Sequence, residues 1–180
     1  MRDKLFRLLK ERAYLFKEEG FRLSSGKISP HYLDCKQVTL YSQALPLIGR
    51  LLWEEARGFK PQAVGGLTLG ADPLVAAVCF AAGLEGIALE GFIVRKEAKG
   101  HGTGKWLEGH VQPGMRAVIL EDVVTTGASA FQAAQKAREF GLEVIGVVAL
   151  VDRAEGGQEY LATQGLPLRS LFTLVDFLNS

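Results

Sequence analysis

One stretch of the chain, residues 116–140, constrains the fold more than any other. It contains the run Val-Ile-Leu at 118–120, which is short, continuous and apolar, as is typical of a buried strand in a parallel sheet. Apolar residues then recur at helical spacing from Phe131 until Gly141, a residue suited to end a helix. The pattern predicts a strand, a loop and a helix, the unit from which α/β domains are built.

The loop between this strand and helix carries groups that suit a phosphorylated sugar. Glu121 and Asp122 end the strand, and Thr-Thr-Gly-Ala-Ser at 125–129 lies where the helix begins. A helix N-terminus attracts phosphate through its free N–H groups and its dipole. Carboxylates repel phosphate but accept hydrogen bonds from hydroxyls, so the combination indicates a phosphorylated ribose. The alternative is an ordinary helix cap beside two exposed acids.

The same segment resembles the motif with which type I phosphoribosyltransferases bind phosphoribosyl diphosphate (PRPP). The match spans about a dozen positions with the expected flanking strand and helix, whereas the two better-known glycine-rich nucleotide motifs are absent. The resemblance implies that the acids hold the ribose hydroxyls and that the loop holds the 5′-phosphate. It nominates Glu121, Asp122, Val123, Val124, Thr125, Thr126, Gly127, Ala128 and Ser129 as PRPP-binding residues.

Composition limits the other possibilities. The chain has 180 residues, 48% of them hydrophobic, which predicts a single domain with a sizeable core. Its 21 basic and 20 acidic residues create no overall field that favours nucleic acid or a membrane. Cys35 and Cys79 lack metal-ligand spacing and are expected to be idle thiols in a reducing compartment. With no signal peptide and no apolar stretch long enough to span a bilayer, we expect a cytoplasmic protein.

Apolar segments predict the remaining elements. Strands are expected at about 62–66, 87–95, 116–121 and 143–151. Helices are expected from Leu5 to near Gly20, over Tyr41–Gly58 and over Leu74–Ala82, with a last short strand or helix at Leu171–Leu178. This alternation predicts an α/β fold with a mainly parallel central sheet flanked by helices. In such sheets ligands bind where strands run into loops.

A turn-rich segment, residues 21–34, precedes these elements and alone predicts a hairpin or loop. Its pattern Phe-x-Leu-x-Ser-Gly-x-x-Ser-Pro-x-Tyr is similar to the N-terminal segment of orotate phosphoribosyltransferases. The resemblance implies a small hood, about residues 1–35, that covers the base. Some members have a lysine where this chain has Ser24. The residues nominated to contact orotate are Ser25, Gly26 and Tyr32.

The glycine-rich stretch from Gly65 to Pro73 is a second place for an anion. Asp72 suits a helix N-cap and Pro73 a first helical residue, and glycines before a helix leave backbone N–H groups accessible. The alternative is a tight connection between strand and helix. By resemblance this is the pyrophosphate loop, with Thr68, Leu69 and Gly70 at its centre. It lacks the lysine of several relatives, so cations from elsewhere are needed.

Residues 96–109 are cationic, rich in glycine and short of packing residues. A solvated hairpin is the alternative for such a segment. The pattern Arg-Lys-Glu-x-Lys-x-His-Gly, however, is similar to the catalytic lid of orotate phosphoribosyltransferases. The resemblance implies a mobile lid that reaches the neighbouring subunit of a homodimer. It nominates Arg95, Lys96, Lys99 and His101 to bind the diphosphate.

Asp152 and Arg153 end the strand predicted at 143–151. Such a pair is often only a surface salt bridge, but a planar guanidinium also suits a carboxylate or a base edge. In orotate phosphoribosyltransferases the matching arginine contacts orotate, so the resemblance nominates Arg153, together with Thr125, as an orotate-binding residue.

Taken over nearly the whole chain, the resemblance implies that orotate and PRPP are converted to orotidine 5′-monophosphate and pyrophosphate, a step of pyrimidine biosynthesis. It names Lys99, His101 and Asp122 as catalytic. It also implies Mg²⁺ held mainly by PRPP, without a direct protein ligand and with water-mediated contacts to Glu121 and Asp122. The alternatives are a phosphoribosyltransferase for another base and a non-catalytic sensor of PRPP or nucleotides. The lid favours an enzyme, and Arg153 with the Ser-Gly segment favours orotate.

Overall fold

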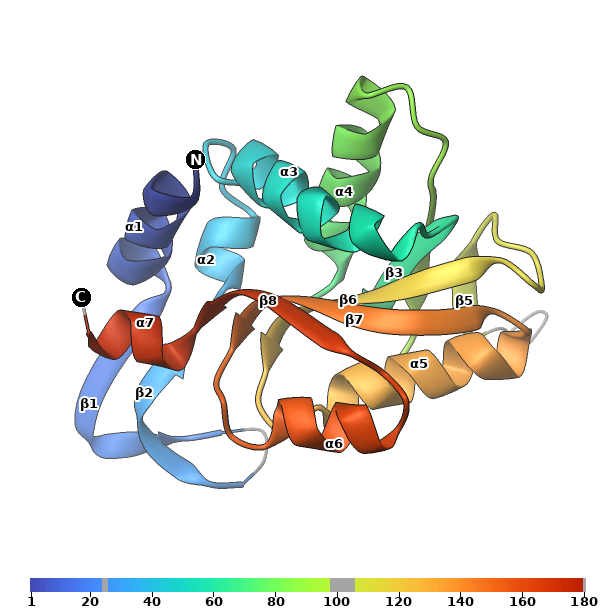
Figure 1. The fold of residues 1–180 in the computed structure, drawn as a ribbon. Helices are drawn as coiled ribbons and strands as arrows, with labels where there is room; N and C mark the ends of the chain where they lie inside the picture. Colours follow the sequence, from blue (N-terminus) through green and yellow to red (C-terminus); the bar gives the residue numbers. More distant parts are fainter. Residues whose placement is uncertain (24–25, 98–105, 180) are drawn as a thin grey trace.

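The structure, a computed structural model, describes residues 1–23, 26–97 and 106–179. A six-stranded sheet forms its centre, and a two-stranded hairpin stands apart from it (Figure 1). The sheet has the order β5-β4-β3-β6-β7-β8, in which only β5 runs antiparallel to its neighbour. Its strands are β3 (Ala63–Leu67), β4 (Glu90–Val94), β5 (Leu107–Gly109), β6 (Arg116–Val124), β7 (Glu143–Asp152) and β8 (Leu168–Thr173).

Helices cover both faces of the sheet. The long helices α3 (Leu45–Ala56) and α4 (Asp72–Leu84) pack on one face, and α5 (Ala128–Phe140) and α6 (Gly157–Thr163) on the other (Figure 1). Shorter elements are α1 (Arg2–Arg12), α2 (Lys36–Thr39), the 3₁₀ helix η1 (Arg57–Phe59) and α7 (Leu174–Leu178). The mainly parallel α/β architecture predicted from the sequence is therefore confirmed.

Strand β6 shows why the sequence folds this way. Val118 and Leu120 belong to the apolar cluster on one face of the sheet, while Ala117 and Ile119 belong to the cluster on the other. A strand that is buried on both faces needs a continuous apolar run rather than an alternating one. No helix among the described residues has the length and apolar character required to cross a membrane.

Several predicted boundaries need correction. The first helix does not extend toward Gly20, because α1 ends at Arg12 and strand β1 (Tyr14–Arg22) begins almost at once. Phe16, which fitted the helical spacing, lies on this strand with 60% of its surface exposed. Antiparallel pairing with β2 (Ile28–Leu33) decides the conformation here, as tertiary context often does.

Two further segments differ from expectation. The strand predicted at 87–95 is shortened to β4, and Ile87 lies in the preceding connection, 45% exposed. The last residues of the predicted lid form β5, where Leu107 pairs with Val94. The C-terminal segment contains both alternatives that were left open, since β8 ends at Thr173 and α7 follows directly.

The hairpin of β1 and β2, which the turn-rich segment predicted, is attached to the main body at several points. The Tyr14 hydroxyl lies 2.7 Å from His31 Nδ1, and the Tyr14 ring stacks on Phe177 of α7. On the other side Arg153, just after β7, donates hydrogen bonds to Ser29 and to the His31 carbonyl. These contacts hold the hairpin over the carboxyl end of the sheet.

Candidate active site

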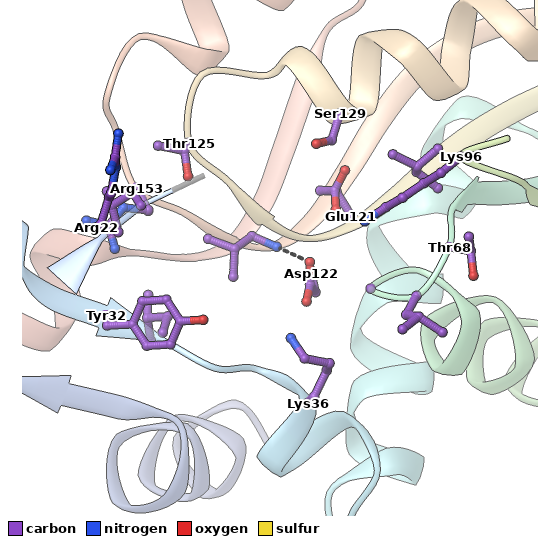
Figure 2. Close-up of a pocket in the computed structure, with 16 residues that line it drawn as sticks. Arg22, Tyr32, Lys36, Thr68, Lys96, Glu121, Asp122, Thr125, Ser129 and Arg153 are labelled. Atoms are coloured by element: carbon purple, nitrogen blue, oxygen red, sulfur yellow. Dashed lines mark hydrogen bonds between the residues drawn. The ribbon is translucent and has the colours of Figure 1, made fainter. Parts of the chain in front are cut away.

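A cavity of about 460 Å³ opens between the carboxyl ends of β3 and β6, the hairpin and α2 (Figure 2). It gathers predicted site residues from all parts of the chain: Tyr32, Thr68, Leu69, Gly70, Lys96, Glu121, Asp122, Val123, Thr125, Ser129 and Arg153. A smaller adjoining hollow is lined in addition by Val124, Thr126, Gly127 and Ala128. Tertiary structure thus brings the separate motifs to one place.

Some predicted site residues lie elsewhere. Arg95 does not line the cavity, because its Nε is 3.1 Å from Glu108 Oε1 on β5. Gly26 also lies outside the lining and shapes the hairpin turn, where its N–H donates to the Leu23 carbonyl at 2.9 Å. Ser25, Lys99 and His101 lie outside the described residues.

The phosphate end of the site is the junction of β6 and α5. Gly127 precedes the helix with φ of 81°, a left-handed conformation that a side chain would strain. A Cβ at this glycine would also come within 3.0 Å of the Leu161 side chain. The loop therefore turns tightly and presents the first N–H groups of α5 to the hollow, an arrangement that suits a phosphate group.

The acid pair occupies the middle of the cavity. Glu121 is only 6% exposed, and burial, followed by the negative charge of Asp122, raises its pKa well above the ordinary value. Among the described residues, Glu121 Oε2 has no hydrogen-bond partner, whereas Asp122 Oδ1 accepts from the Val123 N–H at 2.9 Å. A buried carboxylate oxygen without a partner beside a cavity is suited to a ligand hydroxyl or a metal-bound water.

The same two acids make at most a partial metal site. Within the described parts of the chain, no group of three or more His, Cys, Asp or Glu could hold a metal ion. Mg²⁺ prefers an octahedron of oxygens and keeps several waters, so two carboxylates suffice only if substrate and water supply the other ligands. The unpartnered Glu121 Oε2 and Asp122 fit that limited contribution.

The loop after β3, residues 68–70, forms another wall of the cavity. Gly70 lies against the acid pair, since a Cβ there would meet Asp122 Oδ1 at 2.6 Å. The Thr68 hydroxyl donates to Asp72 Oδ2 at 2.8 Å and so braces the loop. The predicted N-cap role of Asp72 is wrong: the N-cap is Ala71, and Asp72 is the first residue of α4 with its carboxylate engaged by Thr68.

The base end is dominated by Arg153, whose side chain is 2% exposed. Its Nε lies 2.7 Å from Glu155 Oε1, while Nη1 and Nη2 donate to the His31 carbonyl and to Ser29 Oγ, each at 3.1 Å. Asp152 instead accepts from the Ala154 N–H at 2.9 Å. Arg153 therefore does form a salt bridge, as the alternative expected. Its partner is Glu155 rather than Asp152.

Sequence reasoning missed two cationic residues of the cavity, Arg22 and Lys36. Lys36 Nζ lies 3.0 Å from Asp34 Oδ1, and this hydrogen bond is the main cause that raises the Lys36 pKa. Lys36 lies between the recognised motifs, so no local signal marks it. Arg22 occupies a variable position of the hood pattern. Its positive charge among turn residues was the sequence feature that could have identified it as a site residue.

The parallel sheet, the acid pair at the end of β6 and the glycine-containing turn into α5 define a type I phosphoribosyltransferase. No protein-family model matches the chain. Curated relatives do: orotate phosphoribosyltransferase of Aquifex aeolicus is 49% identical over 98% of this chain and 97% of its own length. The Synechocystis enzyme of the same name is 47% identical over 98% of this chain and 88% of its own.

A solved structure agrees with these relatives. Orotate phosphoribosyltransferase of Mycobacterium tuberculosis H37Rv, in complex with Fe(III) dicitrate, superposes with a TM-score of 0.85 at 39% identity, with 98% of both chains covered. The chain belongs to the orotate phosphoribosyltransferases. Its reaction is the transfer of the phosphoribosyl group from PRPP to orotate, a step of pyrimidine biosynthesis.

Proposed function

We propose that the chain performs this transfer in the cavity described above, as a Mg²⁺-dependent homodimer in which each lid serves the neighbouring site. The observation that carries the assignment is the unpartnered Glu121 Oε2 beside Asp122, next to the N-terminus of a long helix. A phosphorylated ribose has a phosphate for the helix end and hydroxyls for the acids. In this proposed function, residues 1–180 form one domain with a hood and a lid.

The remaining roles follow from position in the cavity. Residues 125–129 hold the 5′-phosphate, Glu121 and Asp122 hold the ribose, and residues 68–70 receive the diphosphate, with Lys96 nearby. Tyr32, Thr125 and Arg153 face the base, and Ser25 and Gly26 belong to the same hood segment. Three donors of Arg153 are already engaged, so two N–H groups of its guanidinium remain for orotate.

The phosphoribosyl transfer requires electrostatic stabilisation of its transition state rather than a nucleophilic side chain. When the bond between the anomeric carbon and the diphosphate breaks, positive charge develops on the ribose and negative charge on the leaving group. The acids stabilise the first and the cations the second. Bound Mg²⁺ would supply further positive charge at the diphosphate. Lys99 and His101, as lid residues, exclude water that would hydrolyse PRPP.

A subunit-mixing experiment tests the homodimer, the lid and the acid pair together. Lys99→Ala and Asp122→Ala homodimers should each be nearly inactive. In a mixed dimer, one site combines the intact acid pair of the first chain with the intact lid of the second. Activity should therefore return to roughly half the wild-type value per dimer, if the sites act independently.

Inactive mixed dimers, with composition verified by mass spectrometry, would contradict a lid that acts across the interface. Omission of Mg²⁺ with a chelator present should abolish turnover by the wild-type enzyme, and addition of Mg²⁺ should restore it. A cytoplasmic location stays a prediction that rests on the sequence.

A further inference from the structure

The charge balance around Arg153 bears on how the base is recognised. This guanidinium is the buried cation of the base end, and its Nε contacts the Glu155 carboxylate at 2.7 Å. Its positive charge is thus already compensated inside the protein. Arg153 can still donate hydrogen bonds to a base, but it adds little net charge for an anionic one.

Orotate differs from uracil by a carboxylate, and an anion that enters a partly enclosed cavity needs a cation to offset its lost hydration. Lys36 is paired with Asp34 at 3.0 Å. Lys96 lies at the opposite end, where its charge acts on Glu121 (Figure 2). Neither is a free cation beside the base.

Among the residues that the structure describes, Arg22 is the remaining cation of the cavity lining. It is the last residue of β1, its side chain is exposed, and no described carboxylate forms an ion pair with it. Figure 2 shows Arg22 at the same end of the cavity as Arg153 and Tyr32, far from Lys96. A second positive charge next to the compensated Arg153 makes this end attractive to an anion.

We propose that Arg22 is a specificity-determining residue, which pairs with the carboxylate of orotate while Arg153 holds the hood and hydrogen-bonds the base. The inference rests on the proposed base site and adds a residue to it. The two arginines thus have different roles at the base end. The buried arginine with an internal counter-ion provides geometry, and the exposed arginine without one provides charge.

The test compares two nucleotides that differ only in this carboxylate. Orotidine 5′-monophosphate and uridine 5′-monophosphate are titrated into the full-length protein by calorimetry, with wild type, Arg22→Ala and Arg22→Lys. Arg22→Ala should weaken binding of the first nucleotide about tenfold and of the second less than about twofold. Arg22→Lys keeps the charge and should recover most of the loss.

Lys17→Ala is the matched control, because Lys17 is an exposed cation of the same strand outside the cavity lining. It should change neither affinity. Thermal melting of each variant shows whether the hairpin still folds, and Arg22→Met, which keeps the apolar stem, replaces Arg22→Ala if it does not.

Equal weakening of both nucleotides by the substitution, or no weakening of either, would overturn the role of Arg22. Wild-type turnover of orotate, measured in parallel, would leave the proposed function intact in that case. Failure of the wild-type protein to use orotate would instead count against the proposed function itself.

Discussion

The two ends of the cavity are built in different ways. The phosphate end comes from one continuous segment, in which β6, its acid pair and α5 follow each other within residues 116–140. The base end joins the hairpin to the residues after β7, and the hydrogen bonds from Arg153 to His31 and Ser29 span 122 and 124 positions. The covalent chain therefore holds the groups of the phosphate end close together. The base end depends on tertiary contacts between distant segments.

This difference has consequences for robustness. At the phosphate end the backbone itself provides the ligand groups, and the surrounding strand and helix are anchored in the core. At the base end a few side-chain bonds hold a two-stranded hairpin, an element that is marginal without support. We therefore expect substitutions at the base end to affect orotate selectively, and substitutions at the acid pair to abolish catalysis outright.

Outside the acid pair itself, the largest effect is expected from Gly70→Ala. The new Cβ would come within 2.6 Å of Asp122 Oδ1 and displace the carboxylate that we assign to the ribose. A displacement of about 1 Å at a catalytic group costs about 100-fold in rate, so activity should fall by at least that factor in a folded protein. Steady-state kinetics with circular dichroism would measure both properties.

Gly83→Ala is the control for this change. Nothing lies within 4 Å of a Cβ at Gly83, which belongs to the exposed side of α4. Activity should be unchanged, and the gain in helix propensity should stabilise the fold by about 0.5–1 kcal/mol. Near-normal activity of Gly70→Ala would show that the loop and Asp122 do not act as a unit.

The next effect concerns Arg153→Lys, which tests the base end directly. A lysine cannot make the three directed bonds to Glu155, His31 and Ser29, so the hood and the base contact should loosen together. We expect kcat/KM for orotate to fall about 30-fold, which corresponds to about 2 kcal/mol, with KM for PRPP nearly unchanged.

Arg50→Lys serves as the comparison for this variant, because Arg50 forms an exposed pair with Glu54 on α3. This variant should change neither kcat/KM for orotate nor KM for PRPP. If Arg153→Lys weakened PRPP as much as orotate, the base end would not be separable from the phosphate end.

Glu121→Gln examines the acid pair through pH. Because burial raises the Glu121 pKa, the folded state binds more protons than the unfolded state above the ordinary carboxyl pKa. Stability contributed by this group is complete at acid pH and is lost as pH rises through the folded-state pKa. The neutral amide avoids that loss.

The Gln variant should therefore be more stable than wild type at about pH 8, by roughly 1–3 kcal/mol, and should match it near pH 4. It should also lose activity. Urea denaturation at the two pH values gives the comparison. A stability difference that does not depend on pH would show that ionisation of Glu121 does not destabilise the folded state.

The smallest effect is expected from Tyr14→Phe, which removes the hydroxyl that contacts His31 Nδ1 at 2.7 Å. One hydrogen bond of this kind contributes about 1 kcal/mol, and the ring contact with Phe177 remains. Thermal melting should show a small decrease while PRPP affinity is unchanged. Tyr160→Phe, whose ring packs against Phe131 of α5, is the control, and an equal decrease there would remove the link to the hairpin.

The sequence by itself determined the phosphate end and the class of fold. The apolar run of β6, the acids that end it and the small residues before α5 are adjacent in the chain, so their local geometry follows from backbone propensities. The same holds for Gly141, which ends α5 with φ of 107°. The family resemblance of the motifs agreed with the relatives found.

Only the tertiary structure decided the base end. Helical spacing suggested that Phe16 continues the first helix, but pairing with β2 makes that segment a strand. No local pattern shows that Glu155 compensates Arg153, that Lys36 and Arg22 line the cavity, or that Gly70 abuts Asp122. These contacts form between segments that are far apart in the chain. A short stretch of sequence therefore does not show which residues will meet or how much the contact stabilises the fold.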